Sequence, residues 1–225
     1  MNVYCFSGSG HSLAIARFFA KKLNTDLVTI TSDTDCKDDI AVVVFPVYCQ
    51  NIPQTVAEFL KNSSANHIVL IATYGRISHG NVIWEASKLT GAVVIAAAYV
   101  PTGHSFLGEG TAFDPEPLTP IFERISNLRA ATLKKERKNV LANFFPAWRS
   151  RVGMRIARTD QCDSCNLCGS TCHIHAIQNG IIGRTCIRCM RCVNECPRSA
   201  LRPKPRFFLK LYLKQKKRDD FVIYL

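Results

Sequence analysis

The stretch from Cys162 to Pro197 reads CDSCNLCGSTCHIHAIQNGIIGRTCIRCMRCVNECP and holds eight of the eleven cysteines of the chain. These eight cysteines form two runs with the same spacing, C-x2-C-x2-C-x3-C. The first run is Cys162, Cys165, Cys168 and Cys172, and the second is Cys186, Cys189, Cys192 and Cys196. The second run begins 24 residues after the first, and Ala176-Ile177 is matched by Ala200-Leu201 at the same offset. The stretch is therefore an internal repeat.

This doubled spacing resembles the cysteine pattern of bacterial ferredoxins that carry two [4Fe–4S] clusters. In that family the fourth thiolate of each run points away from its own cluster and binds the other one. The resemblance therefore implies two ligand sets that cross between the runs. One cluster would take Cys162, Cys165, Cys168 and Cys196, and the other would take Cys172, Cys186, Cys189 and Cys192.

Three other uses of the cysteines were weighed against this one. Four disulfides would suit a short secreted chain, whereas this N-terminus resembles no secretion signal. Structural zinc modules usually separate two C-x2-C pairs by a longer gap. A covalent haem needs C-x-x-C-H, and Cys168 to Cys172-His173 has one residue too many. The spacing thus favours iron–sulfur clusters.

The first run departs from the ferredoxin pattern after its last cysteine. It continues as Cys172-His173, where two-cluster ferredoxins usually carry Cys-Pro, as the second run does at Cys196-Pro197. Imidazole can replace thiolate in some clusters and raises their potential. Because all eight cysteine positions are filled, we expect His173 and His175 to be surface histidines beside a cluster, with ligation as the alternative.

The first residues of the chain predict a strand, a small turn and a helix. The β-prone run from Asn2 to Phe6 leads into Ser7, Gly8, Ser9, Gly10, His11 and Ser12, and an amphipathic helix follows. Such a turn presents backbone N–H groups and hydroxyls to a phosphate at a helix N-terminus. The turn carries neither the lysine of a Walker loop nor the third glycine of a dinucleotide fingerprint. A tight turn that merely caps the helix is the alternative.

The Ser/Gly turn resembles the phosphate loop of flavodoxins, which bind FMN without a lysine, although His11 stands where those loops often carry Asn. Further apolar strands are predicted at 27–30, 40–45, 67–73 and 92–99, with helices at 54–61, 81–89 and 118–140. Alternating strands and helices predict an α/β fold with a doubly wound parallel sheet. The resemblance implies five strands in the order 2-1-3-4-5.

In doubly wound sheets the ligand lies beyond the carboxyl ends of the strands. The loops expected there are the Ser/Gly turn, a loop beginning Pro46-Val47-Tyr48, and a loop beginning Thr73-Tyr74-Gly75. Flavodoxins hold the isoalloxazine ring between aromatic side chains on the last two loops. The resemblance therefore implies that Tyr48 and Tyr74 hold the ring, while the alternative is that each tyrosine simply ends a strand. The other three cysteines, Cys5, Cys36 and Cys49, show no metal spacing.

Four segments are predicted: a flavodoxin-like FMN-binding domain (1–140), a basic aromatic linker (141–158), a two-cluster ferredoxin domain (159–201) and a basic amphipathic tail (202–225). Residues 100–120 are expected to form a long irregular loop. We expect the linker and tail to pack the small module onto the larger domain, with contact to a membrane surface or to an acidic partner as the alternative. Phe221–Leu225 is expected to be a last strand or a docked tail.

The formal net charge of +12 is unevenly distributed, with −3 over residues 1–120 and +15 over residues 121–225. Part of this excess offsets the negative charge of thiolate-bound clusters. No nucleic-acid recognition motif accompanies the basic half, so no nucleic-acid partner is expected. No apolar run is long enough to cross a bilayer, and a cytoplasmic location is expected. The oligomeric state is left open.

Together these features resemble a fusion of a flavodoxin-like domain with a two-cluster ferredoxin, a pairing seen in anaerobes. The resemblance implies an electron carrier or a component of an oxidoreductase, which passes electrons between two [4Fe–4S] clusters and FMN. A protein partner or a small electron acceptor would complete the reaction. The alternative is a flavin-free iron–sulfur redox sensor or interaction protein with a degenerate flavodoxin-like domain.

Overall fold

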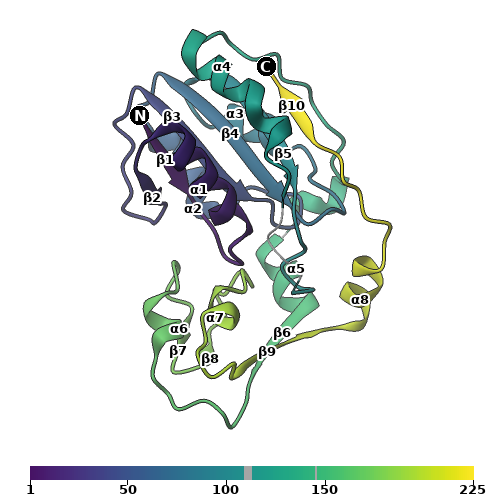
Figure 1. Ribbon diagram of the computed structural model, residues 1–225. Helices are drawn as coiled ribbons and strands as arrows, with labels where there is room; N and C mark the ends of the chain where they lie inside the picture. Colours follow the sequence, from purple (N-terminus) through teal and green to yellow (C-terminus); the bar gives the residue numbers. More distant parts are fainter. Residues whose placement is uncertain (109–112, 145) are drawn as a thin grey trace.

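The apolar runs of the first hundred residues form five parallel strands. The computed structural model describes residues 1–108, 113–144 and 146–225. In it the strands are β1 (Asn2–Cys5), β2 (Leu27–Thr29), β3 (Ile40–Pro46), β4 (His67–Tyr74) and β5 (Val93–Pro101). They lie in the order β5-β4-β3-β1-β2, and all are paired in parallel (Figure 1). This confirms the predicted α/β class.

A sixth strand corrects the predicted count of five and the wholly parallel sheet. β10 (Val222–Tyr224) pairs antiparallel with β5, with Ile223 opposite Ala98. Its side chains alternate between the two faces of the sheet, as a strand requires. Val222 and Tyr224 join the apolar cluster on one face, and Phe221 and Ile223 join the cluster on the other. Of the two alternatives left open for the C-terminus, the strand is correct.

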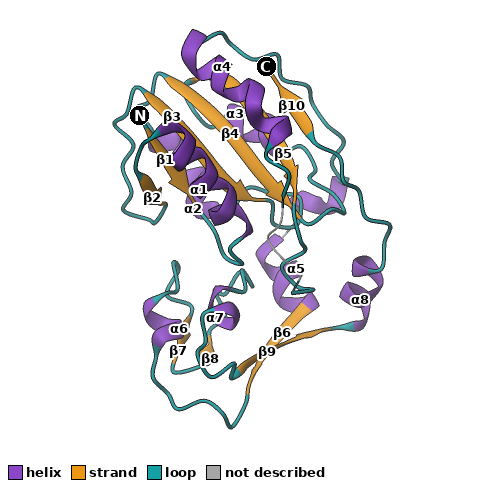
Figure 2. Cartoon of the chain, viewed as in Figure 1, coloured by secondary structure: helices purple, strands orange, loops and turns teal. Residues whose placement is uncertain are grey.

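Helices cover both faces of the sheet (Figure 2). α1 (His11–Leu23) and α4 (Thr119–Asn127) pack on one face, and α2 (Gln54–Asn62) and α3 (Val82–Ser87) on the other. β3 supplies both cores because successive side chains point to opposite faces. Val42 and Val44 belong to the first core, whereas Val43 and Phe45 belong to the second. This double burial explains why β3 is a continuous apolar run.

The helix predicted over 118–140 is wrong in length. A short 3-10 turn, η1 (Glu116–Leu118), leads into α4, which ends at Asn127 because Leu128 adopts a left-handed conformation with φ 51°. The chain then runs without helix along the sheet, where Ala131 N donates to Val94 O at 2.8 Å. Of the irregular stretch predicted over 100–120, positions 109–112 lie outside the described residues.

The cysteine-rich part lies beyond the carboxyl ends of the sheet strands (Figure 1). Its frame is an antiparallel pair, β6 (Met154–Arg158) and β9 (Leu201–Pro205), with a second pair, β7 (Ile177–Gln178) and β8 (Ile181–Ile182). Two helices flank this frame, α5 (Pro146–Gly153) before β6 and α8 (Phe207–Leu213) after β9. β6 thus lies in the predicted linker and β9 in the predicted tail. Another 3-10 turn, η2 (Val140–Asn143), precedes α5.

Candidate functional site

The sequence repeat of the cysteine-rich part is matched by a repeat of its backbone. The four-residue helices α6 (Leu167–Ser170) and α7 (Arg191–Asn194) begin 24 residues apart, which is also the offset between the two cysteine runs. Each helix begins after a residue with positive φ, an uncommon conformation for residues other than glycine. The positive-φ pairs at this offset are Ser164 and Arg188 (60° and 61°), Asn166 and Met190 (59° and 69°), and His175 and Ser199 (48° and 47°).

The first predicted ligand set is brought together around one small cavity. Cys162, Cys165, Cys168 and Cys196 all line it, although Cys196 comes from the other run. Gly180 packs closely against this set, since a Cβ there would lie 3.2 Å from Cys162 Sγ. Ala200 N donates to Cys196 Sγ at 3.3 Å. Cys165 is exposed, so this set lies at the surface of the molecule.

The second predicted set is more deeply buried. Burial raises the pKa of the Cys192 thiol to about 12, and negative charge on Cys189, Cys186, Cys172 and Cys168 raises it further. Burial also raises the pKa of Cys189 to about 11, with Cys186 and Cys172 adding to the effect. The four thiols of this set therefore lie close enough to interact. Cys168 belongs to the first set, so the two sets are neighbours.

Backbone N–H groups donate hydrogen bonds to cysteine sulfurs in both runs. Ala176 N donates to Cys172 Sγ at 3.3 Å, which repeats the contact of Ala200 with Cys196 at the 24-residue offset. Arg188 N donates to Cys186 Sγ at 3.4 Å. Such hydrogen bonds stabilise negative charge on sulfur and tune the potential of a bound cluster.

The two predicted sets together hold eight thiols, the number that two [4Fe–4S] clusters require. In the part of the chain that the structure describes, no three His, Cys, Asp or Glu side chains are arranged to hold one metal ion. A single ion needs all of its sulfur ligands about 2.3 Å from one centre. A [4Fe–4S] cluster instead binds one thiolate at each of four irons, so its ligands stand farther apart. The number of thiols in each set agrees with that requirement.

The buried cysteine set lies directly against the Ser/Gly turn of the sheet part. A Cβ added to Gly8 would lie 2.3 Å from Cys189 O and 2.7 Å from Tyr48 Oη, so only glycine fits there. Asn194 Nδ2 donates to Ser9 O at 3.2 Å across the same interface. Burial raises the pKa of Tyr48 well above its ordinary value, and charge on Cys189 adds to the effect. Tyr48 thus lies between the two parts of the molecule.

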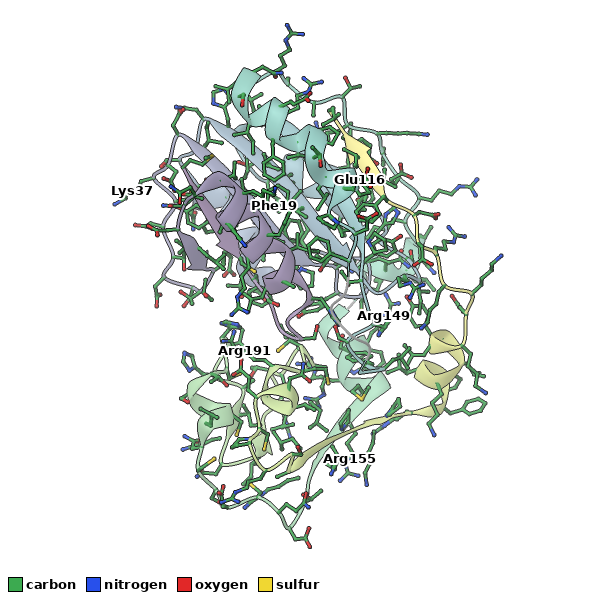
Figure 3. All side chains as sticks on the ribbon, viewed as in Figure 1. Phe19, Lys37, Glu116, Arg149, Arg155 and Arg191 are labelled. Atoms are coloured by element: carbon green, nitrogen blue, oxygen red, sulfur yellow. The ribbon has the colours of Figure 1, made fainter. Side chains whose placement is uncertain are left out.

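His173 occupies this interface, which corrects the expectation of a surface histidine. Its ring is half-buried and packs on Phe6, with ring centres 5.2 Å apart. Arg191, which lies between the two parts in Figure 3, contacts His173 Nε2 and forms a salt bridge with Glu195 at 2.9 Å. Burial lowers the pKa of His173, and the charge of Arg191 lowers it further. His175 is exposed, as expected.

The polar groups of the Ser/Gly turn have partners within the chain. Ser7 Oγ accepts from Gly10 N at 3.2 Å and from Leu13 N at 3.3 Å. Two hydroxyl pairs tie the turn to other loops, Ser9 with Ser105 and Ser12 with Thr73, each at 2.8 Å. His11 is buried. The amides at the start of α1 are therefore turned toward Ser7, and a phosphate would have to displace that hydroxyl.

A cavity of about 360 Å³ separates the loops that follow β3, β4 and β5 from α5 and α8. Its volume is in the range of small-molecule and cofactor sites. Of the predicted FMN contacts, Val47, Tyr48 and Gly75 line it. The predicted Pro46, the last residue of β3, and Thr73, the last but one of β4, do not line it, and Thr73 forms a hydrogen bond with Ser12.

Tyr74 points away from this cavity. Its side chain is buried, and its hydroxyl donates to Asp220 O at 2.8 Å. The ring packs edge-on against His79 with ring centres 5.1 Å apart. Tyr48 and Tyr74 therefore do not face one another across a ring-sized space, and the tyrosine pair implied by the resemblance is not formed in this arrangement.

Residues that the sequence did not predict supply much of the lining of the cavity, from the loop after β5 as well as from α5 and α8. The unpredicted lining residues with aromatic or basic side chains are His104, Phe106, Trp148, Arg149, Arg188, Phe208 and Tyr212. Gly75 is in close contact with His104, since a Cβ there would lie 2.6 Å from that ring. The mixed aromatic and basic composition of 141–158 and 202–218 was the available signal, and it indicated packing rather than a cavity wall.

The chain matches no known family model and no curated protein sequence. Among the described helices none is long and apolar enough to cross a membrane. The arrangement of the chain's own residues therefore carries the functional assignment.

Proposed function

We propose that this chain is an electron-transfer protein that holds two [4Fe–4S] clusters and one FMN. Iron–sulfur clusters exchange single electrons, whereas FMN exchanges one or two. The observation that carries the proposal is the contact of Cys189 with Gly8 and Tyr48. It puts the buried cysteine set directly against the edge of the sheet where an α/β fold binds its ligand.

The cysteine sets would differ in their roles because they differ in position. The first set, with the exposed Cys165, lies where an external redox partner can approach it. The second set, which includes the buried Cys186 and Cys192, faces the sheet part through Cys189. Two cysteines of the second set are buried, whereas the first set has one exposed cysteine and no buried one, so an external partner would reach the first set more easily.

The proposal that FMN binds rests on the sheet and on the large cavity. The strand order β2-β1-β3-β4-β5 agrees with the flavodoxin order, and the cavity opens at the carboxyl ends of β3, β4 and β5. Tyr48 and Gly75 would hold the ring on the sheet side, and Trp148 and His104 would close the cavity around it. The amides at the start of α1 would bind the phosphate once Ser7 Oγ rotates away.

A second candidate function is a flavin-free iron–sulfur sensor or interaction protein. The closed Ser/Gly turn favours it, because Gly8 is covered by Cys189 and Ser9 is bonded to Ser105. In this function the sheet part would bind no flavin and would only hold the cysteine-rich part in place. The redox state of the cysteine-rich part would then be the signal.

Cofactor content of protein purified without oxygen separates the two functions. We expect about eight iron atoms and eight acid-labile sulfides per chain if both cysteine sets hold [4Fe–4S] clusters. One released flavin per chain would support the electron-transfer protein. Full iron with no flavin after incubation with FMN would leave the sensor, and zinc in place of iron would overturn both proposals.

Single cysteine variants test the crossed ligand sets. Cys162→Ser and Cys196→Ser come from different runs but belong to one set, so each should lose the same signal in electron paramagnetic resonance of the reduced protein. Iron should fall to about four atoms in both variants, since one cluster remains. Cys36→Ala, at a buried cysteine of the sheet core, is the control and should keep full iron. Different lost signals for Cys162→Ser and Cys196→Ser would refute the crossed arrangement.

A further inference from the structure

The exposed aromatic side chains of the molecule gather on two neighbouring helices. Trp148 of α5 is 56% exposed, and Phe207 and Phe208 of α8 are 67% and 81% exposed. Val152 and Leu211 on the same helices are also exposed. Among the described residues, every strongly exposed Phe or Trp side chain lies on these helices or, in the case of Phe144, just before α5. We call Trp148, Val152, Phe207, Phe208 and Leu211 the aromatic face.

The two helices are held together as one surface. Arg206 N donates to Gly153 O at 2.9 Å, which joins the end of α5 to the start of α8. Leu209 packs against Gly153, where an added Cβ would lie 3.5 Å away. Trp148, Val152 and Phe208 all border the large cavity. The exposed side chains of α5 and α8 therefore lie close together in space.

The charge around the aromatic face has one sign. Residues 141–158 and 201–218 contain twelve Lys and Arg residues and no Asp or Glu. On α8 and beside it, Arg206, Lys210 and Lys214 are exposed. Fully exposed bulky apolar groups are costly in water, and an unbroken set of positive charges adds repulsion. A partner that is apolar within and negative at its surface removes both costs.

From this complementarity we infer that the aromatic face docks on the surface of an anionic lipid bilayer. Phe207, Phe208 and Leu211 would enter the boundary between headgroups and acyl chains, and Trp148 would lie at the headgroup level that tryptophan prefers. Lys210 and Lys214 would bind the negative headgroups. The short helices would lie on the bilayer without crossing it. The inference rests mainly on Phe207, Leu211, Lys210 and Lys214, which do not line the large cavity, and it requires neither cofactor.

A bilayer suits this surface better than an acidic protein. A protein groove usually receives a continuous helix with apolar anchors along one stripe. Here the apolar groups project from two helices of eight and seven residues, and their exposures reach 81%. Basic residues flank them throughout the two segments. A fluid surface can accommodate such a broad and irregular arrangement, since it imposes no fixed shape.

Vesicle flotation of the full-length, cluster-loaded protein tests the inference. We expect binding to vesicles that contain phosphatidylglycerol, little binding to pure phosphatidylcholine vesicles, and weaker binding at high salt. Lys210→Glu with Lys214→Glu should lower the partition coefficient more than about tenfold, because each charge near the surface contributes about fivefold. Phe207→Ala with Leu211→Ala should lower it by a similar factor, and neither pair lines the cavity.

Matched controls stand elsewhere on the surface. Lys21→Glu with Lys22→Glu makes the same charge change at exposed positions of α1, and Ile181→Ala removes an apolar group that is 68% exposed. Both should bind vesicles within about twofold of the wild type, allowing for long-range charge. An equal loss in the charge control would overturn the inference, because binding would then follow net charge alone.

Two further measurements test whether the aromatic face itself contacts the bilayer and whether it binds an acidic protein instead. In a Trp84→Phe protein, Trp148 is the only remaining tryptophan, so its emission should shift to shorter wavelength on anionic vesicles. An unchanged spectrum together with bound protein would place another surface at the bilayer and overturn the inference. Retention on immobilised poly-glutamate without any vesicle binding would also overturn it and assign the face to an acidic protein.

Discussion

Gly8 is the residue at which the two parts of the molecule approach most closely. Its missing side chain leaves room for the carbonyl of Cys189 and the hydroxyl of Tyr48. The sequence predicts a different role, phosphate binding, for the Ser/Gly turn that contains this glycine. The structure adds a second role, since the same glycine admits the backbone of the cysteine-rich part.

Replacement of Gly8 should therefore weaken the interface. We expect Gly8→Ala to lower the free energy of unfolding by about 1–3 kcal/mol, because the new methyl group must displace backbone atoms of Cys189. Urea denaturation measures the change. Gly91→Ala is the matched control, since a Cβ there meets nothing within 4 Å, and it should cost little. Equal stability of the two variants would show that the parts do not pack as described.

His79 gives the sheet part a predictable dependence on pH. Its ring stacks on Tyr99 with centres 3.9 Å apart, and burial lowers its pKa from the ordinary value. The unfolded chain therefore binds this proton more readily than the folded chain. The stability that neutral His79 contributes is present above about pH 6.5 and is lost as the pH falls through the lowered folded pKa.

His79→Phe keeps an aromatic ring against Tyr99 but cannot take up a proton. Between about pH 8 and pH 5.5, we expect the urea midpoint of the wild type to fall further than that of His79→Phe. His173, whose pKa is also lowered, is present in both proteins and cancels in the comparison. Parallel pH profiles for the two proteins would contradict the assignment.

For single residues, the sequence predicted which cysteines lie together better than it predicted the positions of the tyrosine side chains. The two cysteine runs follow from a local repeat, and the crossed sets are what the ferredoxin resemblance implies. In the structure Cys196 lines the same small cavity as Cys162, Cys165 and Cys168. The position of Tyr74 depends on the carbonyl of Asp220, which lies 146 residues away in the chain. No local pattern around Tyr74 carries that information.

Among the elements, the segment after α4 differs most from its prediction. The sequence predicts a single helix over 118–140. The structure instead ends the helix at Asn127 and lays the following chain across α3 and the sheet edge. Tertiary contacts override the helical preference here. The strands β3, β4 and β5, by contrast, were predictable because each is mainly a run of buried apolar residues.

Lys138 holds this segment in place. Its side chain is only 11% exposed, and Nζ donates to both carboxylate oxygens of Glu85 at 2.8 Å and to Asn51 Oδ1 at 2.9 Å. We expect Lys138→Met to cost about 1–2 kcal/mol, since Glu85 is about one third exposed and keeps part of its hydration.

Hydrogen exchange should localise this loss. Amides of the 128–139 segment should exchange faster in Lys138→Met than in the wild type, while those of β3 and β4 should not change. Arg137→Met alters the exposed neighbour and should remain within about 0.5 kcal/mol of the wild type. Unchanged exchange in Lys138→Met would show that other contacts order the segment.

On the scale of the whole molecule, both ends of the cysteine-rich part return to the sheet. The chain leaves the sheet after β5 and α4, builds the cysteine-rich part, and comes back as β10 at the sheet edge (Figure 1). The sequence left β10 open between a strand and a docked tail, because a five-residue apolar segment fits either. It pairs with β5, the outermost of the five parallel strands on that side of the sheet, and this pairing depends on the complete fold.

Removal of residues 219–225 should expose the edge of β5. That strand is apolar along its length, and unpaired apolar edges associate with one another. We expect the truncated protein to form larger assemblies than the full chain in size-exclusion chromatography with light scattering. Tyr224→Phe is the control, because it removes only the hydrogen bond to Glu136 and keeps the strand. If the truncated chain kept the size of the full chain, β10 would not be needed to protect the edge.

The place of β10 also has a consequence for how the protein is made on the ribosome. About 120 residues separate the end of β5 from the start of β10, so translation at 5–20 residues per second takes roughly 6–24 seconds to cover them. During that interval the eight cysteines emerge while the edge of the sheet is still bare. The sheet that begins with β1 is therefore completed only after the whole cysteine-rich part has been synthesised.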